Sequence, residues 1–239
     1  MGTTWNYRIL LRPEPTRLRE HIRLALDILN ARGFIEQYSE ASGRIVVYGA
    51  DADLDCASLE SCIEQMTQVP LGLELYQPQG VTLMVSAIAE NTQSRKHFAD
   101  YWPKDAFSFY ELCLEIDNAY ARSHEDRASF VCLQRAIVEI FERCEGVFAG
   151  AEHEWIVEEI ASECTLHREI ADGHLPKEVF WMCLFPPEWN GRLSPLERLG
   201  AKTRRTERGT LVSALWEYPW EVDLDAWAGI VRSRIESCK

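Results

Sequence analysis

Glu163 and His167 are the pair of residues whose types and spacing could do chemistry, because a helix places side chains four residues apart on one face. A carboxylate and an imidazole placed in this way could hold a metal ion or exchange a proton with a substrate. No His-Glu-x-x-His motif accompanies them, and the surrounding charges are typical of a solvated helix. A metal-assisted hydrolase built on this pair is therefore one alternative for the function.

Asp51, Asp53 and Asp55 alternate along the chain, as the first ligands of a calcium-binding loop do. Such a loop needs glycine at its sixth position and glutamate at its twelfth, where this sequence has Cys56 and Cys62. The three carboxylates instead indicate the start of a helix, where the macrodipole favours negative charge. With no Gly-x-Ser-x-Gly motif and no phosphate-binding glycine loop either, we expect no cofactor and no enzymatic activity.

The eight cysteines are scattered, and none forms a Cys-x-x-Cys motif. Several lie within apolar stretches, where cysteine is usually a small core residue, so a reducing compartment is expected. The first residues do not have the pattern of a signal peptide, and no apolar run reaches the length of about 18 residues that a membrane span requires. These features predict a cytoplasmic protein without a membrane partner.

The charge of the chain is strongly negative, with 25 Lys and Arg against 38 Asp and Glu, a net charge of −13. This balance disfavours direct binding to nucleic acid, which needs a basic surface, and favours a basic protein partner. Acidic residues gather at 51–64 and 151–172, although a solvated surface that only keeps the protein soluble would look the same. A basic run at 202–208 is expected to be a solvated connector. The candidate partner-binding residues are Glu152, Glu154, Trp155, Glu158, Glu159, Glu163, Asp51, Asp53 and Asp55.

Alternating and helical hydrophobic patterns predict a protein in which strands and helices are interspersed. The predicted strands are 5–11, 34–39, 44–48, 71–76, 81–89, 107–117, 179–185 and 210–218, and the predicted helices are 16–32, 53–68, 126–144, 155–171 and 224–236. Short turns between strands favour an α+β fold, with a mixed or largely antiparallel sheet and packed helices. We expect one domain over 1–239, with subdomains 1–90 and 91–239 as the alternative.

The segment 209–215, of sequence GTLVSAL, is followed by an aromatic turn and then by Asp223, Leu224 and Asp225 at the start of a helix that runs through Ile235. This ending resembles that of bacterial polymorphic-toxin immunity proteins. It is most similar to the immunity family paired with restriction-endonuclease-fold nuclease toxins, including type VI secretion effectors. The opening strand and helix and the length of the chain also suit this family.

The resemblance implies a protein that binds its cognate toxin, a nuclease effector, and blocks it. A nuclease holds phosphates on a basic surface, so a carboxylate-rich inhibitor could occupy that surface or be steered toward it. Besides the hydrolase, an effector adaptor or chaperone of a secretion system remains an alternative. The sequence also leaves a homodimer open.

Overall fold

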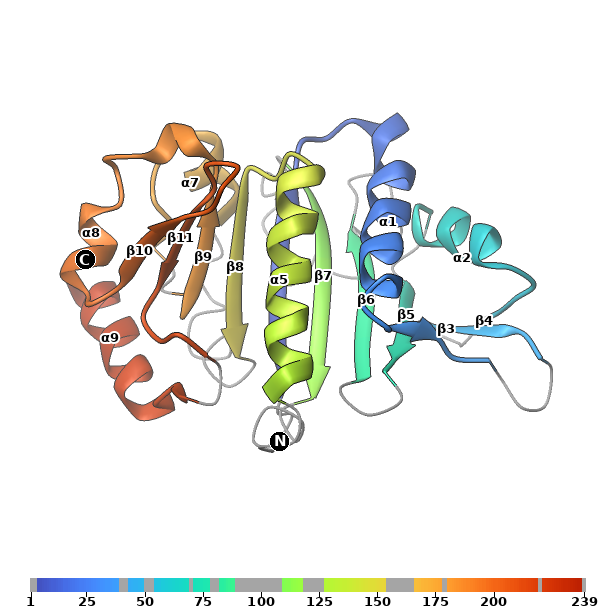
Figure 1. The fold of residues 1–239 in the computed structure, drawn as a ribbon. Helices are drawn as coiled ribbons and strands as arrows, with labels where there is room; N and C mark the ends of the chain where they lie inside the picture. The colour runs from blue at the N-terminus through green and yellow to red at the C-terminus, as the bar shows by residue number, and fades with distance from the viewer. Residues whose placement is uncertain are drawn as a thin grey trace.

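The computed structural model describes residues 4–38, 43–49, 54–68, 71–77, 82–88, 109–117, 127–153, 166–177, 180–218 and 221–237. Its eleven described strands join in one open sheet, and all the pairings between them are antiparallel. Helices pack against this sheet (Figure 1). The prediction of an α+β fold with a largely antiparallel sheet is therefore confirmed.

The strands are β1 (Thr4–Leu11), β2 (Ile35–Glu36), β3 (Ile45–Gly49), β4 (Leu54–Cys56), β5 (Leu71–Tyr76), β6 (Thr82–Ile88), β7 (Tyr110–Asp117), β8 (Phe148–His153), β9 (Met182–Phe185), β10 (Lys202–Arg205) and β11 (Leu211–Ala214). Their order across the sheet is β10-β11-β9-β8-β1-β7-β6-β5-β3-β4, with β2 paired to β5. The helices are α1 (Pro15–Asn30), α2 (Leu59–Met66), α5 (Arg127–Arg143), α7 (Leu166–Ala171), α8 (Ser194–Arg198) and α9 (Leu224–Ser237), with a short 3-10 helix η2 (Pro187–Trp189).

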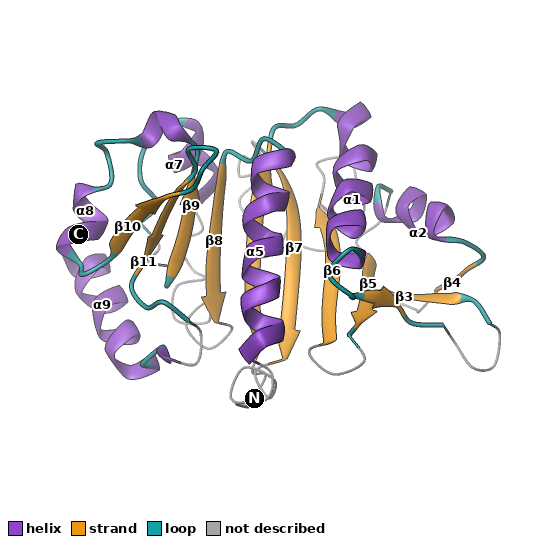
Figure 2. Ribbon diagram, in the orientation of Figure 1, coloured by secondary structure: helices purple, strands orange, loops and turns teal. Residues whose placement is uncertain are grey.

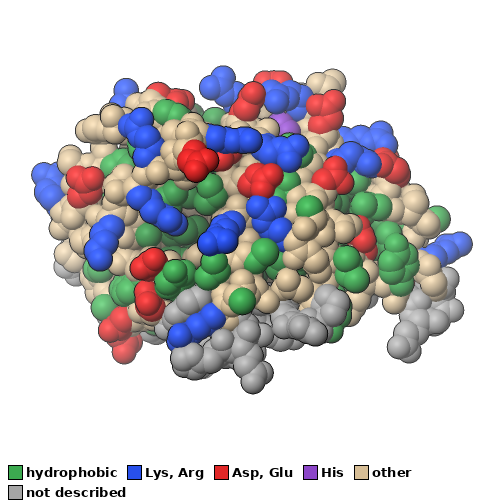
Figure 3. Space-filling model, viewed as in Figure 1, with side chains coloured by type: hydrophobic (Ala, Val, Ile, Leu, Met, Phe, Trp, Pro, Cys, Tyr) green, Lys and Arg blue, Asp and Glu red, His purple; other side chains and the backbone are tan. Residues whose placement is uncertain are grey.

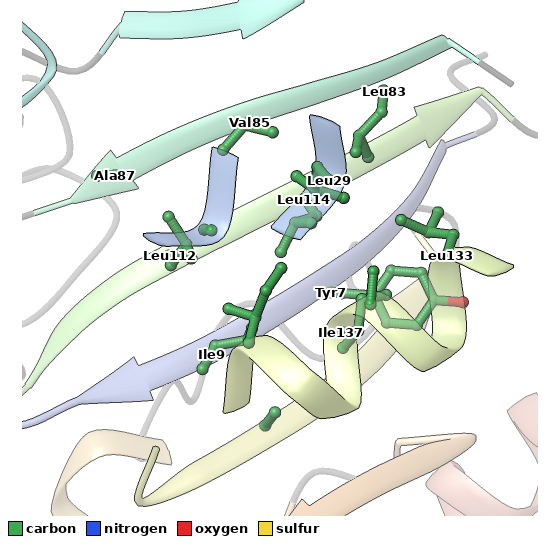
Figure 4. Packing of buried hydrophobic residues seen from close by; sticks show 14 of the residues in the cluster. Tyr7, Ile9, Leu29, Leu83, Val85, Ala87, Leu112, Leu114, Leu133 and Ile137 are labelled. Carbon is green, nitrogen blue, oxygen red and sulfur yellow. The ribbon is translucent and has the colours of Figure 1, made fainter. Parts of the chain in front are cut away.

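The larger hydrophobic core lies between the sheet and the helices α1, α2, α5 and α9, on what we call the helix side (Figure 2). Alternate residues of the central strands point toward it, and every third or fourth residue of the helices meets them. Figure 4 shows Tyr7 and Ile9 of β1 lying toward Leu133 and Ile137 of α5, while Leu29 comes from α1. All five of these side chains are buried.

A second, smaller core lies on the opposite face of the sheet, at the end formed by β8, β9 and β11. Helix α7, η2 and α8 cover it with Leu166, Trp189 and Leu196. Gly150 of β8 makes room for this layer, because a Cβ atom there would lie only 2.5 Å from the ring of Phe180. None of the described helices covers the same face at the other end of the sheet, formed by β3, β5 and β6.

Strand β1 connects the two parts of the chain, because it pairs with β7 on one side and with β8 on the other. A strand from residues 1–90 thus lies between two strands from residues 91–239. The two parts share one continuous sheet, while the number of domains stays a prediction.

Several predicted elements differ in the structure. The helix predicted over 53–68 begins only at Leu59, because Ser58 caps it by accepting a hydrogen bond from the backbone nitrogen of Ser61 at 3.2 Å. Asp55 therefore lies in strand β4 and not at a helix N-terminus. The basic run predicted as a connector forms the exposed edge strand β10. Of the helix predicted over 155–171, only Leu166–Ala171 falls within the described residues.

His21 of helix α1 is expected to make the stability of the protein dependent on pH. Its side chain is buried on α1, and neither ring nitrogen has a hydrogen-bond partner. Burial, and then the positive charge of Arg17, lower the pKa of His21 below its usual 6.5. The unfolded chain therefore binds a proton at a higher pH than the folded chain does.

We expect the free energy of unfolding to fall as the pH is lowered through about 6.5, and to level off below the pKa of folded His21. Urea denaturation between about pH 8 and pH 5.5 measures this dependence. The variant His21→Leu should show a shallower fall over the same range, since it lacks the titrating group. An identical pH dependence in both proteins would contradict the assignment to His21.

Candidate functional site

Two of the nine predicted partner-binding residues, Glu152 and Asp55, lie among the described residues. Asp55 is exposed on β4, whereas Glu152 is buried on β8, with 8% of its surface exposed. The other seven fall outside the described residues: Glu154, Trp155, Glu158, Glu159, Glu163, Asp51 and Asp53. Their role in binding a partner stays a prediction, and so does that of Glu152 and Asp55.

Glu152 belongs to a buried polar cluster centred on Arg8 of β1 and Glu111 of β7. The Arg8 guanidinium donates two hydrogen bonds to Glu111, from Nε to Oε2 at 3.1 Å and from Nη2 to Oε1 at 2.8 Å. Arg8 Nη1 also lies 3.7 Å from Oε2 of Glu152. The cluster forms because Arg8, Leu10 and their cross-strand partners point to the face of the sheet opposite to α1 and α5. Glu111 is fully buried in spite of its charge.

His167 joins this cluster from helix α7. Its Nε2 atom donates a hydrogen bond to Oε1 of Glu111, and its ring contacts that of Phe109, with centroids 5.8 Å apart. The hydrogen bond fixes the start of α7 to strand β7. Its proposed partner in a metal site, Glu163, lies outside the described residues.

The charges of the cluster stabilise one another. Burial by itself would raise the pKa of Glu111, but the charge of Arg8 and the hydrogen bond from His167 lower it well below its usual 4.5. Glu111 is therefore ionised and can only accept hydrogen bonds. Burial, and then the charge of Glu111, raise the pKa of the Cys113 thiol well above its usual 9.0. A thiol of this kind is a poor nucleophile.

The described part of the chain contains no group of three or more His, Cys, Asp or Glu side chains arranged to hold a metal ion. Arg8 and His167 enclose the Glu111 carboxylate. The cluster therefore fits a structural role, in which it holds β1, β7, β8 and α7 together. Exposed residues elsewhere in the protein are better placed than this buried cluster to contact a partner.

The exposed large apolar side chains of the described residues gather at one end of the sheet. They are Ile35 (42% exposed), Tyr38 (59%), Tyr48 (37%), Leu54 (39%) and Tyr76 (37%). All five belong to β2, β3, β4, β5 or the bridge between Tyr38 and Ile45. Contiguous exposed apolar surface bordered by polar residues is typical of a surface that binds another protein, so it matters which of the five share one face.

Strand pairing places three of these side chains on one face. Ile35 lies opposite Tyr76, and Tyr48 lies opposite Gly72, which is four residues before Tyr76 on the same strand. Since opposite residues of an antiparallel pair point to the same side, Ile35, Tyr48 and Tyr76 share the face away from the helices. Leu75 and Val47, their neighbours along the strands, are buried on the helix side.

Carboxylates accompany the aromatic side chains on this face. Glu74 lies between Gly72 and Tyr76, and the Tyr48 hydroxyl donates a hydrogen bond of 3.3 Å to its Oε2 atom. Asp55 lies opposite Val46, which alternates with the buried Val47, so it points to this face as well. We call the five residues Ile35, Tyr48, Asp55, Glu74 and Tyr76 the tyrosine face. Strands β2 to β6 contain no lysine or arginine, while the exposed Arg44 comes directly before β3.

The helix side has a different balance of charge. Figure 3 shows Lys and Arg side chains interspersed with Asp and Glu across it. Arg19 of α1, for example, pairs with Glu60 at 3.0 Å and with Glu64 at 3.1 Å, and Arg23 also pairs with Glu60. The carboxylates of this side are thus partly neutralised within the protein.

The fold and these surfaces define an α+β protein with a single open antiparallel sheet, one end of which exposes aromatic and acidic side chains. No helix in the described ranges is long and apolar enough to cross a lipid bilayer.

No protein-family model matches the sequence, and no curated protein matches it either. Among solved structures, the chain is similar to one titled "Pseudomonas aeruginosa T6SS protein PA0821", with 11% identity and a TM-score of 0.43. The similarity covers 98% of this chain and 72% of the other. At this TM-score the likeness does not support a conclusion about function.

Proposed function

We propose that this protein is an immunity protein, which binds and neutralises a nuclease toxin of the type VI secretion kind in the cytoplasm of the cell that produces it. The observation that carries the proposal is the net charge of −13. A nuclease must present positive charge to the phosphates it holds, so an acidic protein is electrostatically complementary to it. The resemblance of residues 209–235 to the immunity family supports the same function, which needs binding and no catalysis.

The proposal expects a nuclease toxin to be encoded beside the gene of this protein, and the test is neutralisation of that toxin. Co-expression of the two should restore growth, and an equimolar amount of purified protein should stop DNA cleavage by the purified toxin. Raising the salt concentration should slow association, because the opposite charges steer the two proteins together less strongly. An unrelated acidic protein of similar net charge serves as the control and should not inhibit cleavage.

Failure of both growth rescue and inhibition would exclude the proposed function. Binding that leaves DNA cleavage intact would instead identify an adaptor or chaperone. A stoichiometric metal in the purified protein, together with hydrolytic activity, would identify the alternative enzyme.

A further inference from the structure

We infer that the tyrosine face is the surface on which the toxin docks, and that it receives the Lys- and Arg-bearing, phosphate-binding surface of that toxin. The inference rests on the proposed function and adds the place and chemistry of the contact. The inference places the main binding surface at the sheet end formed by β2, β3, β4 and β5, and not in the acidic segment 151–172.

The first argument is the location of exposed apolar surface. The five exposed large apolar side chains of the described residues all lie at this end of the sheet, and three of them belong to the tyrosine face. Tyrosine is enriched among the residues that dominate binding energy, because it buries a large rigid surface and can still form a hydrogen bond. No described helix packs on this part of the sheet.

The second argument is charge complementarity. Asp55 and Glu74 carry negative charge beside the tyrosines, and β2 to β6 contain no lysine or arginine, although Arg44 comes directly before β3. The helix side, in contrast, pairs its carboxylates with Arg19 and Arg23. The carboxylates of the tyrosine face therefore attract positive charge in a partner.

The third argument is the arrangement of Tyr48 and Glu74. Their hydrogen bond orients the carboxylate and the aromatic ring before a partner arrives. A guanidinium or ammonium group could bind the carboxylate while lying over the ring, which combines an ion pair with a cation–π contact. A side chain that is already oriented in the free protein loses less entropy on binding.

Affinity for the toxin encoded beside this gene tests the inference. The variants Tyr48→Ala and Tyr76→Ala should each raise Kd about 10- to 30-fold, as truncation of a residue at the centre of an interface does. Glu74→Lys should slow association at low salt about tenfold, because it replaces an attractive charge with a repulsive one.

The chain offers matched controls for both kinds of change. Tyr38 is exposed but pairs with Ile45, which belongs to the core on the helix side, so Tyr38→Ala should leave Kd unchanged. Glu20 is exposed on α1, and Glu20→Lys alters the net charge as Glu74→Lys does. Thermal unfolding checks that each variant is folded. Hydroxyl-radical labelling of the wild-type complex gives a readout without substitution, with protection expected at Tyr48 and Tyr76 but not at Tyr38.

The outcomes separate this inference from the proposed function. If the wild-type protein neutralises the toxin but the Tyr48 and Tyr76 variants bind as tightly as it does, the docking surface lies elsewhere and the proposed function stands. If these substitutions instead turn a homodimer into a monomer, the tyrosine face is a self-association surface and the inference is overturned. If the wild-type protein neither binds nor neutralises the toxin, both fail.

Discussion

Replacing Arg8 with methionine is expected to lower the free energy of unfolding by about 3 to 5 kcal/mol. Glu111 is fully buried, and Arg8 supplies two of its hydrogen bonds and its main positive charge. Without the guanidinium, a carboxylate would remain in a site where burial disfavours its ionised form. For a chain of this length, the loss corresponds to a fall in Tm of about 6 to 20 °C.

A second substitution distinguishes the effect of charge from the effect of lost packing. The double variant Arg8→Met with Glu111→Gln removes the uncompensated charge, so it should recover at least about 2 kcal/mol relative to Arg8→Met alone. Arg19→Met serves as the control, since Arg19 is exposed and surface ion pairs contribute about 0 to 1 kcal/mol. Chemical denaturation measures all three variants. A loss of less than about 1 kcal/mol for Arg8→Met would show that Glu111 does not depend on Arg8.

Replacing Trp227 with alanine is expected to cost about 3 to 5 kcal/mol and to loosen helix α9 from the sheet. Trp227 is fully buried and stacks on Trp5, with ring centroids 6.4 Å apart and an angle of 5° between the planes. Trp5 in turn packs edge-on against Trp181, with centroids 5.9 Å apart. The truncation would therefore leave a cavity at the point where α9 meets β1 and the core.

Gly229 provides a matched control two residues further along the same helix. A Cβ atom at this position would meet nothing within 4 Å, and alanine favours a helix over glycine by about 0.5 to 1 kcal/mol. Gly229→Ala should therefore stabilise the protein slightly, while Trp227→Ala destabilises it. Hydrogen exchange should be faster in α9 of Trp227→Ala and unchanged or slower in α9 of Gly229→Ala. Unchanged exchange and stability in Trp227→Ala would contradict the anchoring role of Trp227.

The positions of the acidic residues say more about where a partner could bind than the net charge does. Glu111 and Glu152 contribute to the net charge but are buried around Arg8, so they act within the protein. Carboxylates on the helix side are partly neutralised by neighbouring arginines. The acidic residues of the tyrosine face, Asp55 and Glu74, are on strands without a basic residue, with Arg44 directly before the strand between them.

The strongest periodic patterns predicted their elements correctly. Alternation identified β1, β5, β6 and β7, and the helical repeat of Phe130, Leu133, Ile137 and Phe141 identified α5. Each of these elements directs regularly spaced apolar side chains to the larger core on the helix side, and that spacing is a readable period in the sequence. The fold class followed from them, together with the short connections.

Three strands were missed because nothing local distinguishes them. Strand β8 contains Ala149, Gly150 and Ala151, which have little strand preference, and all six of its residues are buried between β1 and β9. Strand β10 has four exposed residues and, among the described strands, pairs with β11 alone. Strand β4 is three residues long and was absorbed into the predicted helix. Their conformation depends on the neighbouring strands, which are distant in the sequence.

The sequence by itself determined the class of fold, the excess of negative charge and the absence of complete catalytic motifs, because composition and local periodicity encode these properties. Only the tertiary structure decided which carboxylates are buried and which aromatic residues are exposed. Glu152 looked like a surface residue within an acidic run, yet β8 turns it toward Arg8. Tyr48 and Tyr76 are distant in the sequence, and the pairing of β3, β5 and β2 brings them to one face. The alternation of residues within 45–48 and 73–76 indicated that each of these strands has two different faces. Which of the two faces stays exposed depended on where the helices pack.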